Sequence, residues 1–289
     1  MRPAESTTLP PEVRTVKTML SAQELDLLYT LAKDQYTGRG EIVDGGAFLG
    51  GSTMALACGL RDNRRVQDGN GRIHSYDLFR ADSYVPQFIG PLPPGASTRP
   101  YYDEVIAPVA AHVSVHEGDI TLMPWPASRD IEILFIDVAK SWEINDFLLT
   151  HFFPRLIPGV SSIIQQDYHW PHTPWLSITM ELLADHITYL GSMPWATAHY
   201  RWERALEPGE LPARLRDLGI NRLRQLANRA HRFECGSREW TAQQCNLVSL
   251  CQSFGLNDDA ASIYDDAVNT APAWVDYFQF RPKLARRAA

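Results

Sequence analysis

The sequence predicts an α/β protein with a doubly wound, mostly parallel sheet of seven strands and a helical appendage at its C-terminal end. Two observations predict the sheet. Short apolar runs alternate with helical segments between residues 41 and 202, and the run at 131–137 is apolar throughout, as expected of a parallel strand covered on both faces. Beyond residue 207, Leu and Arg recur at helical spacing without a strand pattern. We therefore expect three parts, namely an arm at 1–18, a sheet domain at 19–206 and a helical region at 207–289.

The first helix is predicted from a clear start signal. Ser21-Ala22-Gln23-Glu24 has the capping-box pattern, and Leu25 and Leu28 begin an apolar stripe that continues to about residue 32. Residues 1 to about 15 have no such pattern, so we expect a loose arm there.

The remaining elements follow in alternation. Apolar runs bounded by turn residues predict strands at 41–45, 72–77, 113–119, 131–137, 160–167, 187–191 and 195–202. Helical spacing predicts helices from about residue 52 and at 101–111, 142–156, 175–186, 211–232, 240–254 and 257–270. The prolines between residues 80 and 100 forbid regular structure, and this long segment is either a substrate-side lid or a surface excursion.

The amino-acid composition narrows the range of functions expected of this protein. Hydrophobic residues make up 45% and charged residues 21% of the 289, the balance of an ordinary globular protein. A net charge of −7 argues against nucleic acid as the main partner, so a small-molecule substrate is expected. Four cysteines without a Cys-x-x-Cys pair, no export signal and no run of 18 apolar residues predict a cytoplasmic protein without a membrane partner. The helical region is expected to pack on the sheet domain or on another subunit of a homo-oligomer.

A glycine-rich turn follows the first predicted strand. Its glycines fall at positions 45, 46, 50 and 51, so no frame of the dinucleotide pattern Gly-x-Gly-x-x-Gly fits. The frame that fits is acid-x-Gly-x-x-x-Gly, formed by Asp44, Gly46 and Gly50. Glycines let the backbone approach a ligand, and the helix that opens at about Ser52 points free N–H groups at the turn. The turn predicts a nucleotide-type site, although such turns also serve phosphate sites.

Each of the first five predicted strands ends in an acid. Ligands bind at the carboxyl ends of parallel strands, so these acids predict a polar rim around a site. Each carboxylate alone is equally well explained as a cap of the following helix. The five residues are Asp44, Asp77, Asp119, Asp137 and Asp167.

The turn and these acids resemble the class I S-adenosylmethionine (SAM)-dependent methyltransferases, whose fold is a Rossmann-like sheet of seven strands. Their motif I turn passes beneath the methionine and ribose parts of SAM. Asp77, 33 residues after Asp44, matches the acid that binds the ribose hydroxyls, and Gly118-Asp119 matches the element beside the adenine. The resemblance implies SAM as cofactor, held by Asp44, Gly45, Gly46, Ala47, Phe48, Gly50, Ser52, Asp77, Leu78, Gly118, Asp119, Ile120 and Asp137.

A narrower resemblance is to the macrocin and related antibiotic-sugar O-methyltransferases and to cephalosporin-hydroxylase-like sequences. It rests on Ile136-Asp137-Val138-Ala139-Lys140-Ser141-Trp142 and on Gln166-Asp167-Tyr168-His169. It implies O-methylation of a hydroxyl on a small molecule in natural-product biosynthesis, with Asp137, Asp167 and Gln166 as ligands of a magnesium ion. Lys140 stands where the group often has His, and Gln166 replaces an acid, so a metal requirement is left open.

Methyl transfer requires alignment of the reacting groups and removal of a proton from the acceptor. His169 is the first candidate base because its ordinary pKa is near 6.5, although it is nearly as well explained as a hydrogen-bonded loop residue. Lys140 and Asp137 are the other predicted catalytic residues, with Lys140 binding the substrate or an acid on the rim. Two alternatives stay open, a nucleotide-cofactor oxidoreductase and a non-catalytic assembly protein with this fold.

Overall fold

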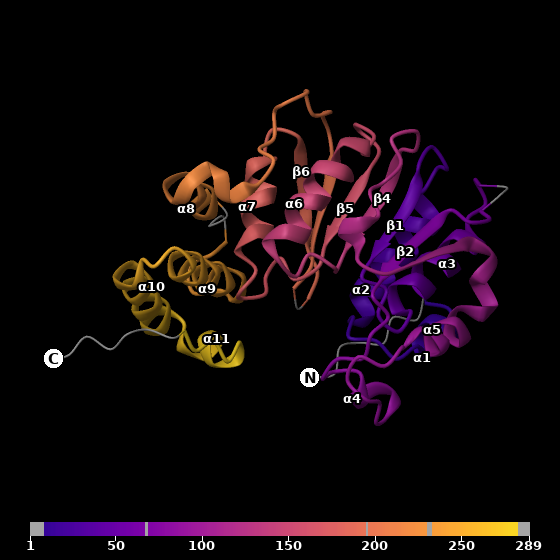
Figure 1. Ribbon diagram of the computed structural model, residues 1–289, viewed down its shortest axis with the longest axis horizontal. Helices are drawn as coiled ribbons and strands as arrows, with labels where there is room; N and C mark the ends of the chain where they lie inside the picture. Colours follow the sequence, from indigo (N-terminus) through magenta and orange to yellow (C-terminus); the bar gives the residue numbers. More distant parts are fainter. Residues whose placement is uncertain (1–8, 67–68, 195, 230–232, 283–289) are drawn as a thin grey trace. The chain divides into compact units, whose positions relative to one another are not determined.

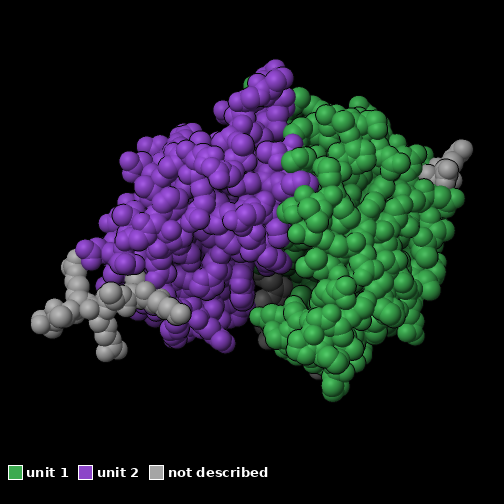
Figure 2. Space-filling view, viewed as in Figure 1, with its two compact units in different colours: residues 1–138, 151–166, 189–205 green, residues 139–150, 167–188, 206–289 purple. Residues whose placement is uncertain are grey.

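The computed structural model describes residues 9–66, 69–194, 196–229 and 233–282. The chain forms two compact units, shown in different colours in Figure 2. Unit 1 comprises residues 1–138, 151–166 and 189–205, and unit 2 comprises residues 139–150, 167–188 and 206–289. The expected division near residue 206 coincides with the start of the last segment of unit 2. Residues 139–150 and 167–188, however, group with the C-terminal helices and not with the sheet.

Unit 1 contains a sheet of seven strands in the order β3-β2-β1-β4-β5-β7-β6 (Figure 1). The strands from β1 to β5 pair in parallel, and β7 runs antiparallel to β5. The register sets Gly45 of β1 beside both Tyr76 of β2 and Ile136 of β4, so these three strands end together at one edge. The predicted doubly wound sheet is confirmed. Its strands are β1 (Glu41–Gly45), β2 (Ile73–Asp77), β3 (Val113–Glu117), β4 (Ile131–Ile136), β5 (Ser162–Gln165), β6 (Ile187–Ser192) and β7 (Ala198–Trp202).

The helices of unit 1 begin with α1 (Pro11–Thr15) and α2 (Ala22–Thr30). The predicted capping box is present, because the Ser21 N–H donates to Glu24 Oε2 at 2.7 Å and the Glu24 N–H donates to Ser21 Oγ at 3.3 Å. The chain continues as a π-helix, η1 (Leu31–Gln35), which packs with α2 against α3 (Gly51–Asp62). A Cβ on Gly59 would lie 2.4 Å from the Tyr29 carbonyl oxygen, so glycine permits this close helix packing.

Prolines explain why two helices of unit 1 begin in segments for which no helix was predicted. Pro11 opens α1 inside the predicted arm, and Pro86 opens a short helix, α4 (Pro86–Ile89), inside the predicted loop. Proline suits a first helical position because its missing N–H is not needed there. After helix α5 (Arg99–Ile106), the predicted helix 101–111 ends as a 3₁₀-helix, η2 (Ala107–His112). Two further 3₁₀-helices are η3 (Ile120–Leu122) and η4 (Phe153–Arg155).

Unit 2 is helical, as predicted for the C-terminal region. Helix α9 is buried along most of its length and contacts α7, α8, α10 and α11 (Figure 1). Helix α7 is buried at every residue from Pro174 to Glu181 and contacts α8 and α9, which is why residues 167–188 belong to this unit. No helix among the described residues is long and apolar enough to cross a membrane. The elements are α6 (Trp142–His151), α7 (Pro174–Leu182), η5 (Leu215–Leu218), α8 (Gly219–Arg229), α9 (Arg238–Ser253), α10 (Asn257–Thr270) and α11 (Pro272–Tyr277), the last of which the sequence analysis missed.

Candidate functional site

The glycine turn of unit 1 is tied to the ends of both neighbouring strands. The Gly46 N–H donates to the Tyr76 carbonyl at 2.8 Å, and the Asp137 N–H donates to the Gly45 carbonyl at 2.7 Å. These bonds extend the β1–β2 and β1–β4 pairings by one step past the strand ends. The predicted turn, the end of β2 and Asp137 therefore lie together at the carboxyl edge of the sheet.

Gly46 and Gly50 lie at positions where any other residue would have a strained backbone and too little space for its Cβ. Both have left-handed backbone, with φ of +95° and +94°. A Cβ on Gly46 would lie 2.8 Å from the carbonyl carbon of Asp137, and one on Gly50 would lie 3.1 Å from Val105. Gly50 is also the N-cap residue of α3, so its conformation sets the direction of the helix N-terminus. Phe48 also has a positive φ, of 48°, which makes this turn tightly wound.

Asp44 lies fully buried beneath the turn. One carboxylate oxygen, Oδ2, accepts hydrogen bonds from Thr53 Oγ1 at 2.5 Å and Ser75 Oγ at 3.1 Å. Burial raises the pKa of this carboxyl group, and the bond from Thr53 opposes the shift. The other oxygen, Oδ1, is buried and forms no hydrogen bond of standard geometry among the described residues, although the Ser52 side chain also lowers the pKa of this carboxyl group. A buried acceptor left open in this way suits a ligand that brings an N–H group.

Asp77 links β2 to the turn. Its Oδ2 accepts a hydrogen bond from the Phe48 N–H at 2.8 Å, and its Oδ1 accepts one from the Phe79 N–H at 2.7 Å. Burial raises the pKa of Asp77, while these two bonds oppose the shift. A carboxylate has about four acceptor positions, so two remain for the hydroxyl groups of a ligand. The neighbouring Leu78 side chain is exposed.

One of the predicted adenine-side residues, Gly118, is hydrogen-bonded to Asp77. The Gly118 N–H donates to the Asp77 carbonyl at 2.9 Å, which joins the end of β3 to the end of β2. Asp119 is exposed and caps η3 by accepting a hydrogen bond from the Thr121 N–H at 2.9 Å, and this bond lowers its pKa. Ile120 is buried. Asp119 therefore has a structural role of its own beside any role in binding.

The sequence analysis missed a segment that lies across the turn. Thr18, Met19 and Leu20, here called the strap, line one hollow. A Cβ on Gly51 would lie 2.4 Å from Thr18 Oγ1, so glycine at this position admits the strap. The hollow measures about 10 Å³, room for one water molecule. No motif marks the strap in the sequence. Its other lining residues come from the turn, the start of α3 and the end of β4, namely Gly46, Ala47, Phe48, Gly51, Ser52 and Asp137.

The predicted catalytic residues fall in both units. Asp137 belongs to unit 1, whereas Lys140 and His169 belong to unit 2, as does the predicted metal ligand Asp167. Within unit 2, Lys140 Nζ lies 2.5 Å from Asp167 Oδ2, so this lysine is paired with an acid of the predicted rim. Asp167 has a left-handed backbone, with φ of 61°.

His169 lies inside unit 2 with no exposed surface. Its ring packs edge-on against Tyr168 and Phe233, with centroid distances of 4.9 and 5.0 Å. Burial lowers the pKa of His169 to about 3. A proton acceptor in catalysis has to reach its substrate and hold a proton near neutral pH. This environment therefore argues against His169 as the general base and favours the packing interpretation.

Two of the predicted magnesium ligands are already engaged by other side chains. The Asp167 carboxylate already has the Lys140 ammonium beside it, and the Gln166 side chain is hydrogen-bonded to Thr197. Thr197 in turn donates to the buried carboxylate of Glu24 at 2.6 Å. Across the described ranges, no three His, Cys, Asp or Glu side chains are grouped to hold a metal ion. We assign no step to magnesium.

Buried histidines make the stability of the chain depend on pH. Burial lowers the pKa of His169 to about 3 and of His199 to about 4, so both are neutral in the folded protein. In the unfolded chain they take up protons below a pH of about 6.5, so stability is lost as the pH falls from there toward 4. At pH 5 we expect each to lower the unfolding free energy by about 2 kcal/mol relative to pH 7.5. Urea unfolding at both pH values measures this, and His199→Gln should reduce the difference. The buried acids Asp44 and Asp77, whose pKa values are raised, act in the opposite direction, so an unchanged difference in His199→Gln is the result that would contradict the prediction.

Comparison with known proteins gives matches among solved structures only. No family model matches the chain, and no curated protein does. CalS11, a TDP-rhamnose 3'-O-methyltransferase of calicheamicin biosynthesis, is 21% identical over 63% of this chain and 78% of its own, with a TM-score of 0.46. An O-methyltransferase from Bacillus cereus, solved with S-adenosylhomocysteine, is 17% identical over 63% and 80%, with a TM-score of 0.42. A SAM-dependent O-methyltransferase from Thermotoga maritima is 14% identical over 68% and 74%, with a TM-score of 0.42.

Proposed function

We propose that this protein is a SAM-dependent methyltransferase that methylates a hydroxyl group of a small molecule. The proposal rests on three features that lie together at the carboxyl edge of the sheet. A left-handed glycine turn approaches Asp137, the Asp77 carboxylate has acceptor positions left, and Asp44 keeps one buried oxygen open. This arrangement suits a ligand with hydroxyl groups on one part and an ammonium group on another, which SAM combines.

Each part of the site has a separate task in this proposal. SAM supplies an electrophilic methyl group on a positively charged sulfur. Gly46 and Gly50 give the backbone room to approach the cofactor, and Asp77 accepts the ribose hydroxyls. Asp44 Oδ1 faces the ammonium group, either directly or through water. The part of the site that faces the adenine is formed by Leu78, Gly118, Asp119 and Ile120.

Asp137 is the proposed residue for the acceptor hydroxyl. It lines the hollow beside the turn, is half-buried, and carries an oxygen that can accept the hydroxyl proton or orient the group. Lys140 and Asp167 form an ion pair within unit 2, and we propose substrate binding as the role of Lys140. The macrocin-like acceptor class, a sugar hydroxyl of a natural product, remains part of this proposal, as do the homo-oligomer and the cytoplasmic location.

Cofactor binding requires the strap to move. The hollow that the strap closes has room for one water molecule, which is far less than SAM needs. The contact between Thr18 and Gly51 therefore has to open when the methionine part of SAM lies on the turn. The strap then serves as an outer wall of the loaded site.

Thermal-shift and calorimetric titration with SAM, S-adenosylhomocysteine and NAD test the proposed function. We expect both adenosyl compounds to bind and to raise the unfolding temperature, because ligands that bind only the folded state stabilise it. NAD should have no effect, since the turn lacks the dinucleotide spacing. A shift with NAD alone would favour the oxidoreductase alternative. Binding of none of the three would favour an assembly protein.

A further inference from the structure

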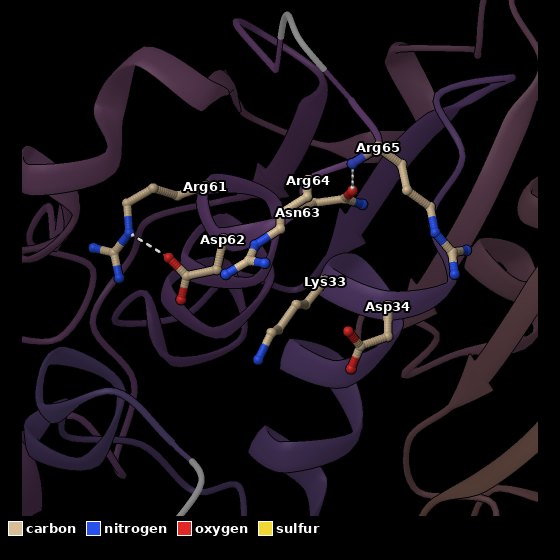
Figure 3. A pocket seen from close by; sticks show the side chains of 7 residues that line it. All are labelled: Lys33, Asp34, Arg61, Asp62, Asn63, Arg64 and Arg65. Carbon is tan, nitrogen blue, oxygen red and sulfur yellow. Dashed lines mark hydrogen bonds and ion pairs between the residues drawn. The ribbon is translucent and has the colours of Figure 1, made fainter.

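A second hollow lies at the opposite end of α3 from the glycine turn. Helix α3 has 12 residues and therefore a length of about 18 Å, which separates the two places. The hollow measures about 760 Å³ and shares no lining residue with the cofactor site. Lys33 and Asp34 of η1 lie on one side of it, and the segment from Arg61 to Arg65 lies on the other (Figure 3).

The two sides of this hollow are fastened together by Asn63. Its side-chain amide donates to the carbonyl of Ala32 at 2.8 Å and to that of Tyr36 at 2.9 Å. Its Oδ1 accepts a hydrogen bond from the Arg65 N–H at 2.7 Å. Asn63 is buried, so these bonds hold the end of α3 against the π-helix η1. The walls are thus in place before any ligand arrives, and π-helical turns are frequent at functional sites.

The charges around the hollow do not cancel. Arg61 is engaged by Asp62 at 3.1 Å and by Glu12 at 3.2 Å, so it contributes little free charge. Asp62 is further satisfied by a hydrogen bond from the Tyr29 hydroxyl at 2.8 Å. Among the described residues, the ion pairs at this hollow involve Arg61 and not Lys33, Arg64 or Arg65, although Lys33 lies near enough to Asp62 to help lower its pKa. Against the remaining Asp34, these three cations leave a positive site in a protein with a net charge of −7.

Helix electrostatics account for only part of this cluster. Cations in the last turn of a helix offset the negative end of its dipole, which explains Arg61 on α3 and Lys33 on η1. Arg64 and Arg65 lie beyond the end of α3 and have no such role. Their shared feature is the hollow that they line (Figure 3).

We propose that this hollow binds a small ligand carrying a diphosphate group. Its volume lies within the range of about 300–1,000 Å³ that is typical of small-molecule sites. Guanidinium groups pair with phosphate oxygens through two parallel hydrogen bonds, and a lysine ammonium adds a point charge. Cations on two facing walls suit a ligand with two linked anionic groups. A free diphosphate and the diphosphate of a nucleotide share this chemistry.

Calorimetry with the full chain at constant ionic strength tests the proposal, with pyrophosphate, phosphate and UDP as probes. We expect pyrophosphate to bind at least tenfold more tightly than phosphate. UDP binding more tightly than pyrophosphate would identify a nucleoside diphosphate as the ligand, and weaker UDP binding would identify a free diphosphate. UDP is used because it lacks the adenine that the cofactor site is proposed to bind.

The variant Arg64→Gln/Arg65→Gln should lower pyrophosphate affinity at least tenfold while leaving SAM affinity unchanged. Arg222→Gln/Arg229→Gln on α8 makes the same charge change elsewhere and should have no effect. Both pairs have surface-accessible side chains, and circular dichroism checks their fold. Equal binding of phosphate and pyrophosphate, or equal loss in the two double variants, would overturn the proposal, because either result indicates unspecific charge attraction.

Discussion

Gly46→Ala is expected to abolish measurable SAM binding and to destabilise unit 1. Alanine at a φ of +95° is strained by about 1–3 kcal/mol. Its Cβ would also lie 2.8 Å from the carbonyl carbon and 2.9 Å from the carbonyl oxygen of Asp137, and backbone atoms cannot rotate away. The turn would have to move from the end of β4, which separates the cofactor cradle from Asp137. We expect an affinity loss of at least about 100-fold, equivalent to about 3 kcal/mol.

Gly159→Ala provides the matched control for this experiment. Gly159 also has a left-handed backbone, with φ of +71°, but nothing lies within 4 Å of the Cβ that alanine would add. Its variant should show the conformational destabilisation alone and keep normal SAM affinity. Calorimetry measures the affinity, and urea unfolding measures the stability. If Gly46→Ala bound SAM within threefold of the parent, the turn would not be the cradle.

Asp77→Asn is expected to weaken SAM binding by about 10- to 100-fold. A hydrogen bond to a charged acceptor contributes about 1.5–3 kcal/mol, and the amide keeps only one acceptor oxygen. The new NH₂ group would also face the N–H of Phe48 or Phe79, both of which now donate to the carboxylate. Two donors facing each other repel, so the turn loosens at the point where it meets β2.

Asp82→Asn is the control variant. It removes a carboxylate that also accepts backbone hydrogen bonds but lies outside the proposed cofactor site. Asp82 Oδ1 accepts hydrogen bonds from the Tyr84 N–H at 2.8 Å and the Val85 N–H at 3.2 Å, in an exposed loop of the same unit. Its variant should alter SAM affinity by less than threefold. Unchanged SAM affinity in Asp77→Asn would remove the ribose assignment, and the resemblance to motif I would then lose its strongest second element.

The parts of the fold that the sequence predicted correctly depend on local patterns. The strand at 41–45 and the capping box at Ser21 are found at the predicted residues, because apolar runs and capping chemistry act over a few positions. The meeting of the turn with Asp77 and Asp137 was also predictable, since parallel strands bring their carboxyl ends together.

The missed features depend on contacts between distant residues. The ring of His169 packs against Phe233, 64 positions later, so its burial depends on a contact that the local sequence does not show. The grouping of α7 with α8 and α9 depends on which apolar faces meet, and periodicity does not determine that. The sequence predicted that Lys140 binds either the substrate or an acid of the rim, and no local pattern indicated that its partner is Asp167.

The contact of Thr18 with Gly51 has a kinetic consequence. If SAM rests on the turn as proposed, it can do so only after the strap lifts, and we expect its association to be a two-step event. At low cofactor concentration the observed rate rises linearly, and at high concentration it levels off at the lifting rate. Under the proposed function, the strap residues Thr18, Met19 and Leu20 are therefore expected to set the maximum rate of cofactor loading.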